Sequence, residues 1–138
     1  MTRSGATHER FPGSTVCAVL MAVAAVTFWL ASFIHFGATF SIGSTRVSDP
    51  FPGAAIPEAI VGVVVALGAL GLFARWRLSW RLAVGTTAFA IIVTLYGLSV
   101  TLGGGRSADV AYHVSVLAVL FVVLATLMAG HRGRPRTL

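Results

Sequence analysis

The chain has 138 residues, of which 57% are hydrophobic and 10% are charged, and its net charge is +6 at neutral pH. Because a soluble domain carries about 25% charged residues, this composition excludes an ordinary water-soluble domain and indicates a membrane protein. The basic residues are all arginines in short clusters beside apolar runs, an arrangement that argues against a nucleic-acid partner and is typical of charges that fix membrane topology.

Four apolar runs occupy most of the chain. Each holds about 20 residues, enough for a helix rising about 1.5 Å per residue to cross a hydrocarbon core of about 30 Å. Only a helix satisfies all of its backbone hydrogen bonds within such a segment. The predicted fold class is therefore all-α, a four-transmembrane-helix bundle with antiparallel up-down topology. The spans are Thr15–Phe36, Ile56–Ala74, about Leu82–Leu102 and about Val110–Gly130, with the transmembrane domain over 15–130 and basic tails at 1–14 and 131–138.

The first run has a signal peptide as its alternative interpretation, because Arg3 and Arg10 precede it. Its apolar stretch is longer than the usual 7–15 residues or so, and no small-residue cleavage site ends it, so we expect a retained membrane helix. Cys17, near its start, is the only cysteine, which excludes an intramolecular disulfide and a dithiol redox centre. We expect Cys17 to be a small packing residue.

The link between the first two runs, residues 37–55, is unusually apolar for a loop. Phe40, Ile42, Val47 and Phe51 punctuate it, and prolines stiffen its second half. A disordered loop would hold fewer apolar residues. We expect this link to fold back over the outer end of the bundle as a cap, with a short extended piece within 39–42.

The later runs differ in how they can pack. The second run carries a small-xxx-small pair, Gly62 and Ala66, and the third is rich in hydroxyl side chains and glycine. Helices in lipid associate through such close contacts and polar groups. We therefore expect the second and third helices to form the inner pair. The fourth run is almost uniformly bulky, so much of its surface is expected to face lipid.

The arginines predict the orientation of the chain in the membrane. Eight fall on one side of the predicted spans and two on the other, which is a strong positive-inside pattern. Both termini and the link between the second and third helices are therefore predicted to be cytoplasmic. The arginine-rich side comprises Arg3, Arg10, Arg75, Arg77, Arg81, Arg132, Arg134 and Arg136, and the other side Arg46 and Arg106.

Four ionisable residues are predicted to lie at similar depth near the outer face. His35 ends the first helix, Glu58 lies in the first turn of the second, Asp109 precedes the fourth and His113 lies in its first turn. Ionisable groups in membrane segments are costly and often mark function. Imidazole and carboxylate ligands suit Zn²⁺, Cu²⁺ or Fe²⁺, two histidines on facing helices could ligate a haem, and the same groups could handle protons.

A purely structural role for these residues is the other interpretation. Glu58 near a helix start is favoured by the helix dipole, Asp109 can act as a cap, and the histidines can reach interfacial water. Should a metal site exist, we expect its ligands to be His35, Glu58 and His113.

Three short segments resemble the small four-helix bacterial membrane proteins of the DoxX-like families. They are Phe33-Ile34-His35, Ile56-Pro57-Glu58 and Tyr112-His113, and the resemblance covers about residues 15–130. The resemblance implies a four-helix architecture more than an activity. It also draws attention to His35, Glu58 and His113.

No catalytic motif is present in the sequence, neither a phosphate-binding glycine loop nor a nucleophile elbow. We therefore expect a multi-pass protein of the bacterial plasma membrane, more consistent with a non-enzymatic accessory or partner-binding subunit than with an enzyme. Its partners would be the lipid bilayer and a membrane protein or further copies of itself. The alternatives are a redox- or metal-linked membrane protein that uses the outer His/Glu group, and a small oligomeric transporter.

Overall fold

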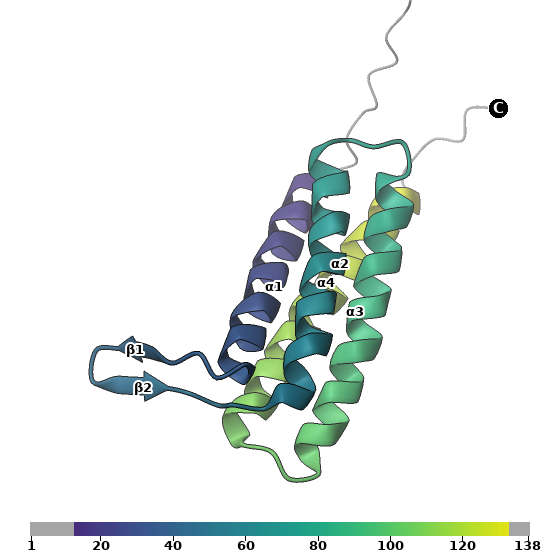
Figure 1. The fold of residues 1–138 in the computed structure, drawn as a ribbon. Helices are drawn as coiled ribbons and strands as arrows, with labels where there is room; N and C mark the ends of the chain where they lie inside the picture. The colour runs from purple at the N-terminus through teal and green to yellow at the C-terminus, as the bar shows by residue number, and fades with distance from the viewer. Residues whose placement is uncertain (1–12, 133–138) are drawn as a thin grey trace, which may run out of the picture.

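The computed structural model describes residues 13–132. In chain order it contains α1 (Ser14–His35), β1 (Phe40–Ile42), β2 (Thr45–Val47), α2 (Pro52–Phe73), α3 (Ser79–Leu102) and α4 (Ser107–Arg132). The helices lie side by side in one bundle (Figure 1), so the predicted all-α class is confirmed. Each is long and apolar enough to cross a membrane. The predicted basic tails, 1–14 and 131–138, fall outside the described residues except where they enter α1 and α4.

Three helices begin three or four residues earlier than the sequence suggested: α2, α4 and also α3, which starts at Ser79 rather than about Leu82. The second helix starts at Pro52 rather than Ile56, because proline is well suited to a first helical position, where its missing N–H needs no partner. Pro57 is therefore inside α2, and Glu58 lies in the second turn instead of the first. The fourth helix starts at Ser107, which places Asp109 within its first turn and His113 in its second.

The core is shared by side chains from all four helices, and small residues set the spacing between them. Gly62 packs against α1, where an added Cβ would lie 2.5 Å from the Trp29 ring. Gly68 touches both Met21 of α1 and Thr86 of α3. The more buried helices are α1 and α2, so the expected inner pair of second and third helices is wrong: α1 also offers small side chains inward. The least buried helix is α4, as predicted.

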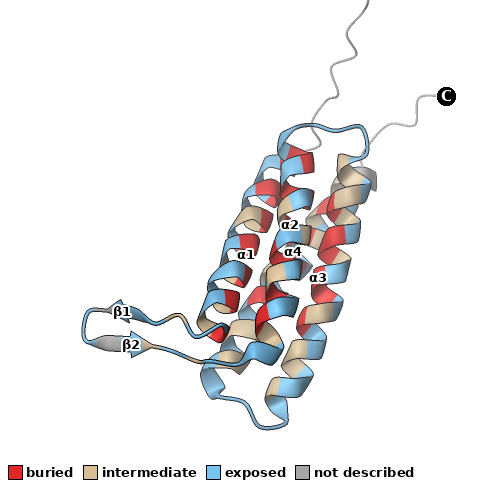
Figure 2. Ribbon diagram, viewed as in Figure 1, coloured by how far each residue is buried: buried red, intermediate tan, exposed pale blue. Residues whose placement is uncertain are grey.

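The buried residues of the helices line the interior of the bundle (Figure 2), and many large apolar side chains are exposed. A water-soluble bundle would place polar groups at such exposed positions. This arrangement suits lipid as the surrounding solvent. Examples from the four helices are Val23, Leu30, Ile60, Leu67, Ile92, Leu95, Val114 and Val122, all about half exposed or more.

Within the link that was expected to fold back as a cap, residues 40–47 form a hairpin that projects sideways from the bundle (Figure 1). The strands are antiparallel with Phe40 opposite Val47, and a two-residue turn contains Gly43 at φ +60°, a conformation that tight hairpin turns require. The facing backbone groups of the two strands pair with each other in this register. The extended piece expected within 39–42 is confirmed as β1.

The links between the helices, and the first and last helix ends, lie at two opposite ends of the bundle. The start of α1, the link from α2 to α3 and the end of α4 lie at one end (Figure 1). Trp80 at the start of α3 donates a hydrogen bond to the carbonyl of Leu127 near the end of α4, at 2.9 Å. The other end, here called the hairpin end, holds the hairpin and the link from α3 to α4.

Candidate functional site at the hairpin end

A cluster of ionisable side chains lies at the hairpin end of the bundle. His35 is the last residue of α1, Glu58 lies in the second turn of α2, and Asp109 lies in the first turn of α4. Asp49 comes from the segment between β2 and α2. We call these four residues the hairpin-end cluster. Four different parts of the chain therefore meet in one polar group at the end of an otherwise apolar bundle.

His35 and Glu58 form the buried centre of the cluster. The Nδ1–H of His35 donates to Oε2 of Glu58 at 2.7 Å, and the two side chains are only 11% and 9% exposed. The other carboxyl oxygen of Glu58, Oε1, is buried and has no hydrogen-bond partner among the described residues. A buried carboxylate is costly unless compensated, so a positive charge near this side chain would stabilise it.

The orientation of His35 is fixed from several directions. Its backbone carbonyl accepts the N–H of Phe51 at 3.0 Å, and the Phe51 ring meets the imidazole edge to face at 6.1 Å. One turn earlier, the hydroxyl of Ser32 donates to the carbonyl of Ala55 at 2.7 Å and ties α1 to α2. Because Nδ1 is committed to Glu58, Nε2 is the nitrogen that can accept a metal ion.

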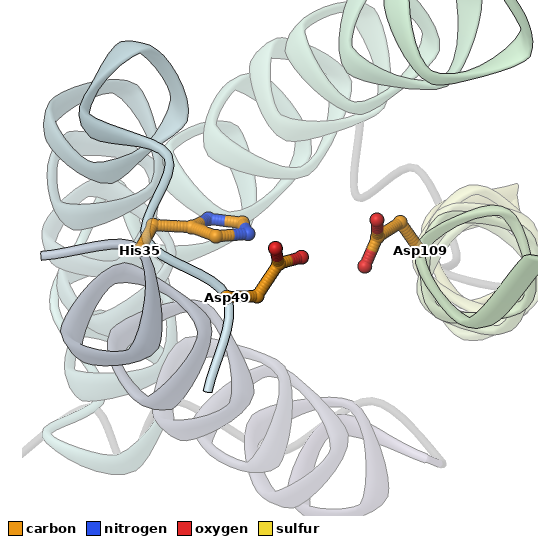
Figure 3. A group of neighbouring side chains, drawn as sticks. All are labelled: His35, Asp49 and Asp109. Atoms are coloured by element: carbon orange, nitrogen blue, oxygen red, sulfur yellow. The ribbon is translucent and has the colours of Figure 1, made fainter. Parts of the chain in front are cut away.

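Asp49 and Asp109 complete a group of possible metal ligands around His35. Each of the three residues has a ligand atom within 4.8 Å of those of the other two. Figure 3 shows the two carboxylates and the imidazole directed toward a common space, with Asp109 approaching from α4. One imidazole nitrogen and two carboxylate oxygens suit Zn²⁺, Mn²⁺ or Fe²⁺. Such a site would leave at least one coordination position for another ligand.

This ligand set differs from the predicted one of His35, Glu58 and His113. Glu58 contacts His35 directly, but as the partner of Nδ1. The Nδ1–H of His113 donates to the backbone carbonyl of Asp109 at 2.7 Å, and its Nε2 packs against α3, where a Cβ on Gly97 would lie 2.7 Å away. The geometry therefore favours Asp49 and Asp109 over Glu58 and His113 as ligands beside His35.

The sequence offered unequal signals for the two aspartates. Asp109 was recognisable as one of the ionisable residues near the outer ends of the helices, with a role as a helix cap as the alternative. Asp49 was not singled out, because the path of the long link could not be deduced from its composition. The available signal was that Asp49 is one of only four acidic residues in the chain.

Arg106, in the link from α3 to α4, reaches across to the same group. Its Nη1 lies 3.2 Å from Oδ1 of Asp49 and donates to the carbonyl of Ser48 at 3.4 Å. The arginine side chain is 66% exposed, so this ion pair contributes at most about 1 kcal/mol. Arg106 therefore holds Asp49 weakly and would compete with a metal ion for its carboxylate.

Two cavities meet at the hairpin-end cluster. The larger, of about 600 Å³, lies mainly between α2 and α3, and the smaller, of about 480 Å³, lies between α1 and α4. The cluster thus lies on the wall between two spaces and is reachable from either. The residues that line both cavities are His35, Asp49, Arg106, Asp109 and His113.

No protein-family model, curated protein or solved structure matches this chain. The resemblance to the DoxX-like families is therefore neither supported nor refuted by these comparisons.

Proposed function

We propose that the protein is a metal-binding, multi-pass protein of the bacterial plasma membrane, with a divalent transition-metal site formed by His35, Asp49 and Asp109. The observation that carries this proposal is the convergence of these three ligand atoms within 4.8 Å. The unpaired Oε1 of Glu58 supports it, because a cation on the far side of the imidazole would stabilise that buried carboxylate. A histidine that ligates a metal commonly donates its other N–H to a carboxylate, as His35 does here.

We further propose that the chain crosses the bilayer four times in up-down order, with both termini on the cytoplasmic side. The placement of the arginines supports this orientation. The end of the bundle opposite the hairpin carries Arg75 and Arg77 in the link from α2 to α3 and Arg81 in the first turn of α3, all exposed. The hairpin end carries Arg46 and Arg106. The metal site would then face the outside of the cell.

The other expectations become alternatives to this proposal. A haem between two histidines is less consistent with the geometry, because His113 turns its Nε2 toward the α3 backbone. A non-enzymatic accessory subunit and a small oligomeric transporter remain compatible with four apolar helices. Neither accounts for the three converging ligand atoms, so the metal-binding function is preferred.

The test is a count of bound metal in the purified full-length protein. The protein is stripped with a chelator in detergent, loaded with Zn²⁺, desalted and analysed for zinc by mass spectrometry. We expect about one zinc per chain, and its loss in His35→Ala, Asp49→Asn and Asp109→Asn.

His113→Ala is the matched control, since it removes a neighbouring histidine that the geometry excludes from the ligand group. This variant should keep its zinc. Zinc-free wild-type protein would overturn the proposal and favour the accessory subunit. Loss of zinc in His113→Ala with retention in Asp49→Asn would instead favour His35, Glu58 and His113 as the ligands.

A further inference from the structure

We propose that the larger cavity binds a lipid-soluble molecule: an apolar chain or ring that carries one neutral or singly negative oxygen-donor group, which completes the coordination of the metal. This inference rests on the proposed function, because the oxygen would bind the ion held by His35, Asp49 and Asp109. To the proposed metal-binding function, the inference adds the chemical class of the ligand and the cavity that holds the apolar part of that ligand.

The coordination chemistry leaves room for such a donor. Three protein ligands are one fewer than the four that zinc normally takes, and sites of this kind keep the remaining position for water or an exogenous ligand. Two aspartates already balance the charge of a divalent ion. A neutral or singly negative oxygen group would therefore be accepted more readily than a doubly charged one.

The cavity has the size and polarity of a site for an amphiphile. Its volume of about 600 Å³ lies within the range of small-molecule pockets, roughly 300–1,000 Å³. The polar groups of the hairpin-end cluster occupy one part of its wall, and apolar side chains occupy much of the rest. These apolar residues include Phe28, Phe51, Val61, Val93 and Val100.

The rim of the cavity is accessible from the outer surface of the bundle. Tyr96 is 71% exposed and Val100 48% exposed, and both line the cavity from α3. Phe51, on the opposite side, is half exposed. Since the outward faces of these helices are apolar, a ligand dissolved in the bilayer could enter between α2 and α3 without crossing water.

A pair of hydroxamic acids that differ only in chain length tests the inference. Acetohydroxamic acid offers the oxygen donors alone, and octanoyl hydroxamic acid adds an apolar chain. Binding of each to zinc-loaded protein is measured by isothermal titration calorimetry in detergent. We expect the octanoyl compound to bind about tenfold more tightly or better, because its chain leaves water for the cavity.

Variants that fill the cavity distinguish binding of the octanoyl chain in the cavity from its partition into detergent. Val93→Trp and Ala54→Trp add bulk to its wall from α3 and α2, whereas Leu95→Trp and Ile60→Trp add the same bulk on exposed surfaces of the same helices. We expect either cavity variant to lose most of the chain-length advantage while keeping its zinc and its affinity for acetohydroxamic acid. The two surface variants should behave as wild type.

The outcomes distinguish this inference from the proposed function. A protein that binds no zinc overturns both. A protein that binds zinc but shows the same chain-length advantage in the cavity and surface variants overturns only the amphiphile site. Equal binding of octanoyl hydroxamic acid to wild-type protein and to zinc-free Asp109→Asn would show that metal coordination is not involved, and would overturn the inference in that form.

Discussion

His35 is positioned for its proposed role by contacts that do not involve a metal. The carboxylate of Glu58 holds Nδ1, the ring of Phe51 packs against the imidazole, and the Phe51 N–H binds the backbone carbonyl. These contacts fix the ring before any ion arrives. A ligand held in its binding orientation loses little further conformational freedom when the ion binds, which favours affinity.

Replacement of Glu58 by glutamine tests this positioning directly. The amide keeps the size of the side chain but removes the negative charge that supports the imidazole. We expect zinc affinity to fall by about 10–100-fold, the usual effect of losing such a partner. Isothermal titration of the variant and wild type measures the change. Unchanged affinity in a folded variant would show that the carboxylate is not part of the metal site.

Replacement of Arg106 by glutamine should have the opposite effect. The guanidinium group lies 3.2 Å from the Asp49 carboxylate and must give it up, at least in part, when a metal binds. Because an exposed ion pair of this kind contributes up to about 1 kcal/mol, zinc affinity should rise by no more than about fivefold. A weaker affinity for zinc in Arg106→Gln would mean that the arginine supports the site rather than competing with it.

At the scale of single residues, the sequence identified His35, Glu58, Asp109 and His113 as unusual but could not assign their partners. His35 and Glu58 interact through their side chains and are both buried, and His113 is hydrogen-bonded to the backbone carbonyl of Asp109. The role of Asp49 depends on the return of the chain after β2, which brings residues 49–51 to the end of α1. No local pattern in the sequence encodes that return.

At the scale of elements, the helices were predicted closely because about 20 apolar residues in lipid have no alternative to a helix. Helix starts were less predictable. Pro57 looked like the beginning of the second helix, yet Pro52 occupies the first position and Pro57 lies within α2. The hairpin was missed as a unit because its two strands are only three residues each, and a single pair of short strands leaves a weak pattern.

The packing of α2 can be tested with two glycines in different surroundings. A methyl group on Gly68 would collide with the Thr86 side chain and the end of Met21, whereas one on Gly85 would meet no atom within 4 Å. We expect Gly68→Ala to destabilise the bundle by about 1–3 kcal/mol. Gly85→Ala should be neutral or stabilising, by up to about 1 kcal/mol.

Unfolding of the two variants in mixed detergent–dodecyl sulfate micelles, followed by circular dichroism, gives both free energies. Equal effects of the two substitutions would contradict the close approach of α2 to its neighbours at Gly68. A large loss of stability in Gly85→Ala would contradict the exposed position of that residue in α3.

At the scale of the whole molecule, the proposed orientation decides which side of the membrane holds the metal site. Two single-cysteine variants report on the two ends of the bundle. One carries its cysteine at Ser44 in the hairpin turn, and the other at Leu78 in the link from α2 to α3; both positions are exposed. In a Cys17→Ala background, a membrane-impermeant maleimide added to right-side-out vesicles should label Ser44→Cys. Leu78→Cys should react only after the vesicles are opened.

Labelling of Leu78→Cys alone in sealed vesicles would invert the orientation and place the cluster in the cytoplasm. The composition and the arginine pattern predict the membrane spans and their orientation, because both act on whole segments rather than on single contacts. The candidate site could not be predicted in this way, because it depends on how four separate parts of the chain meet.

The most direct measurement is zinc K-edge X-ray absorption on the zinc-loaded protein in lipid nanodiscs. The scattering of imidazole rings beyond the directly bound atoms counts the histidines on the metal. The proposed site gives a shell of oxygen and nitrogen ligands at about 2.0–2.2 Å with a single imidazole, and that imidazole signal disappears in His35→Ala. Two imidazoles, a sulfur ligand from Cys17, or no bound zinc would contradict a site formed by His35, Asp49 and Asp109.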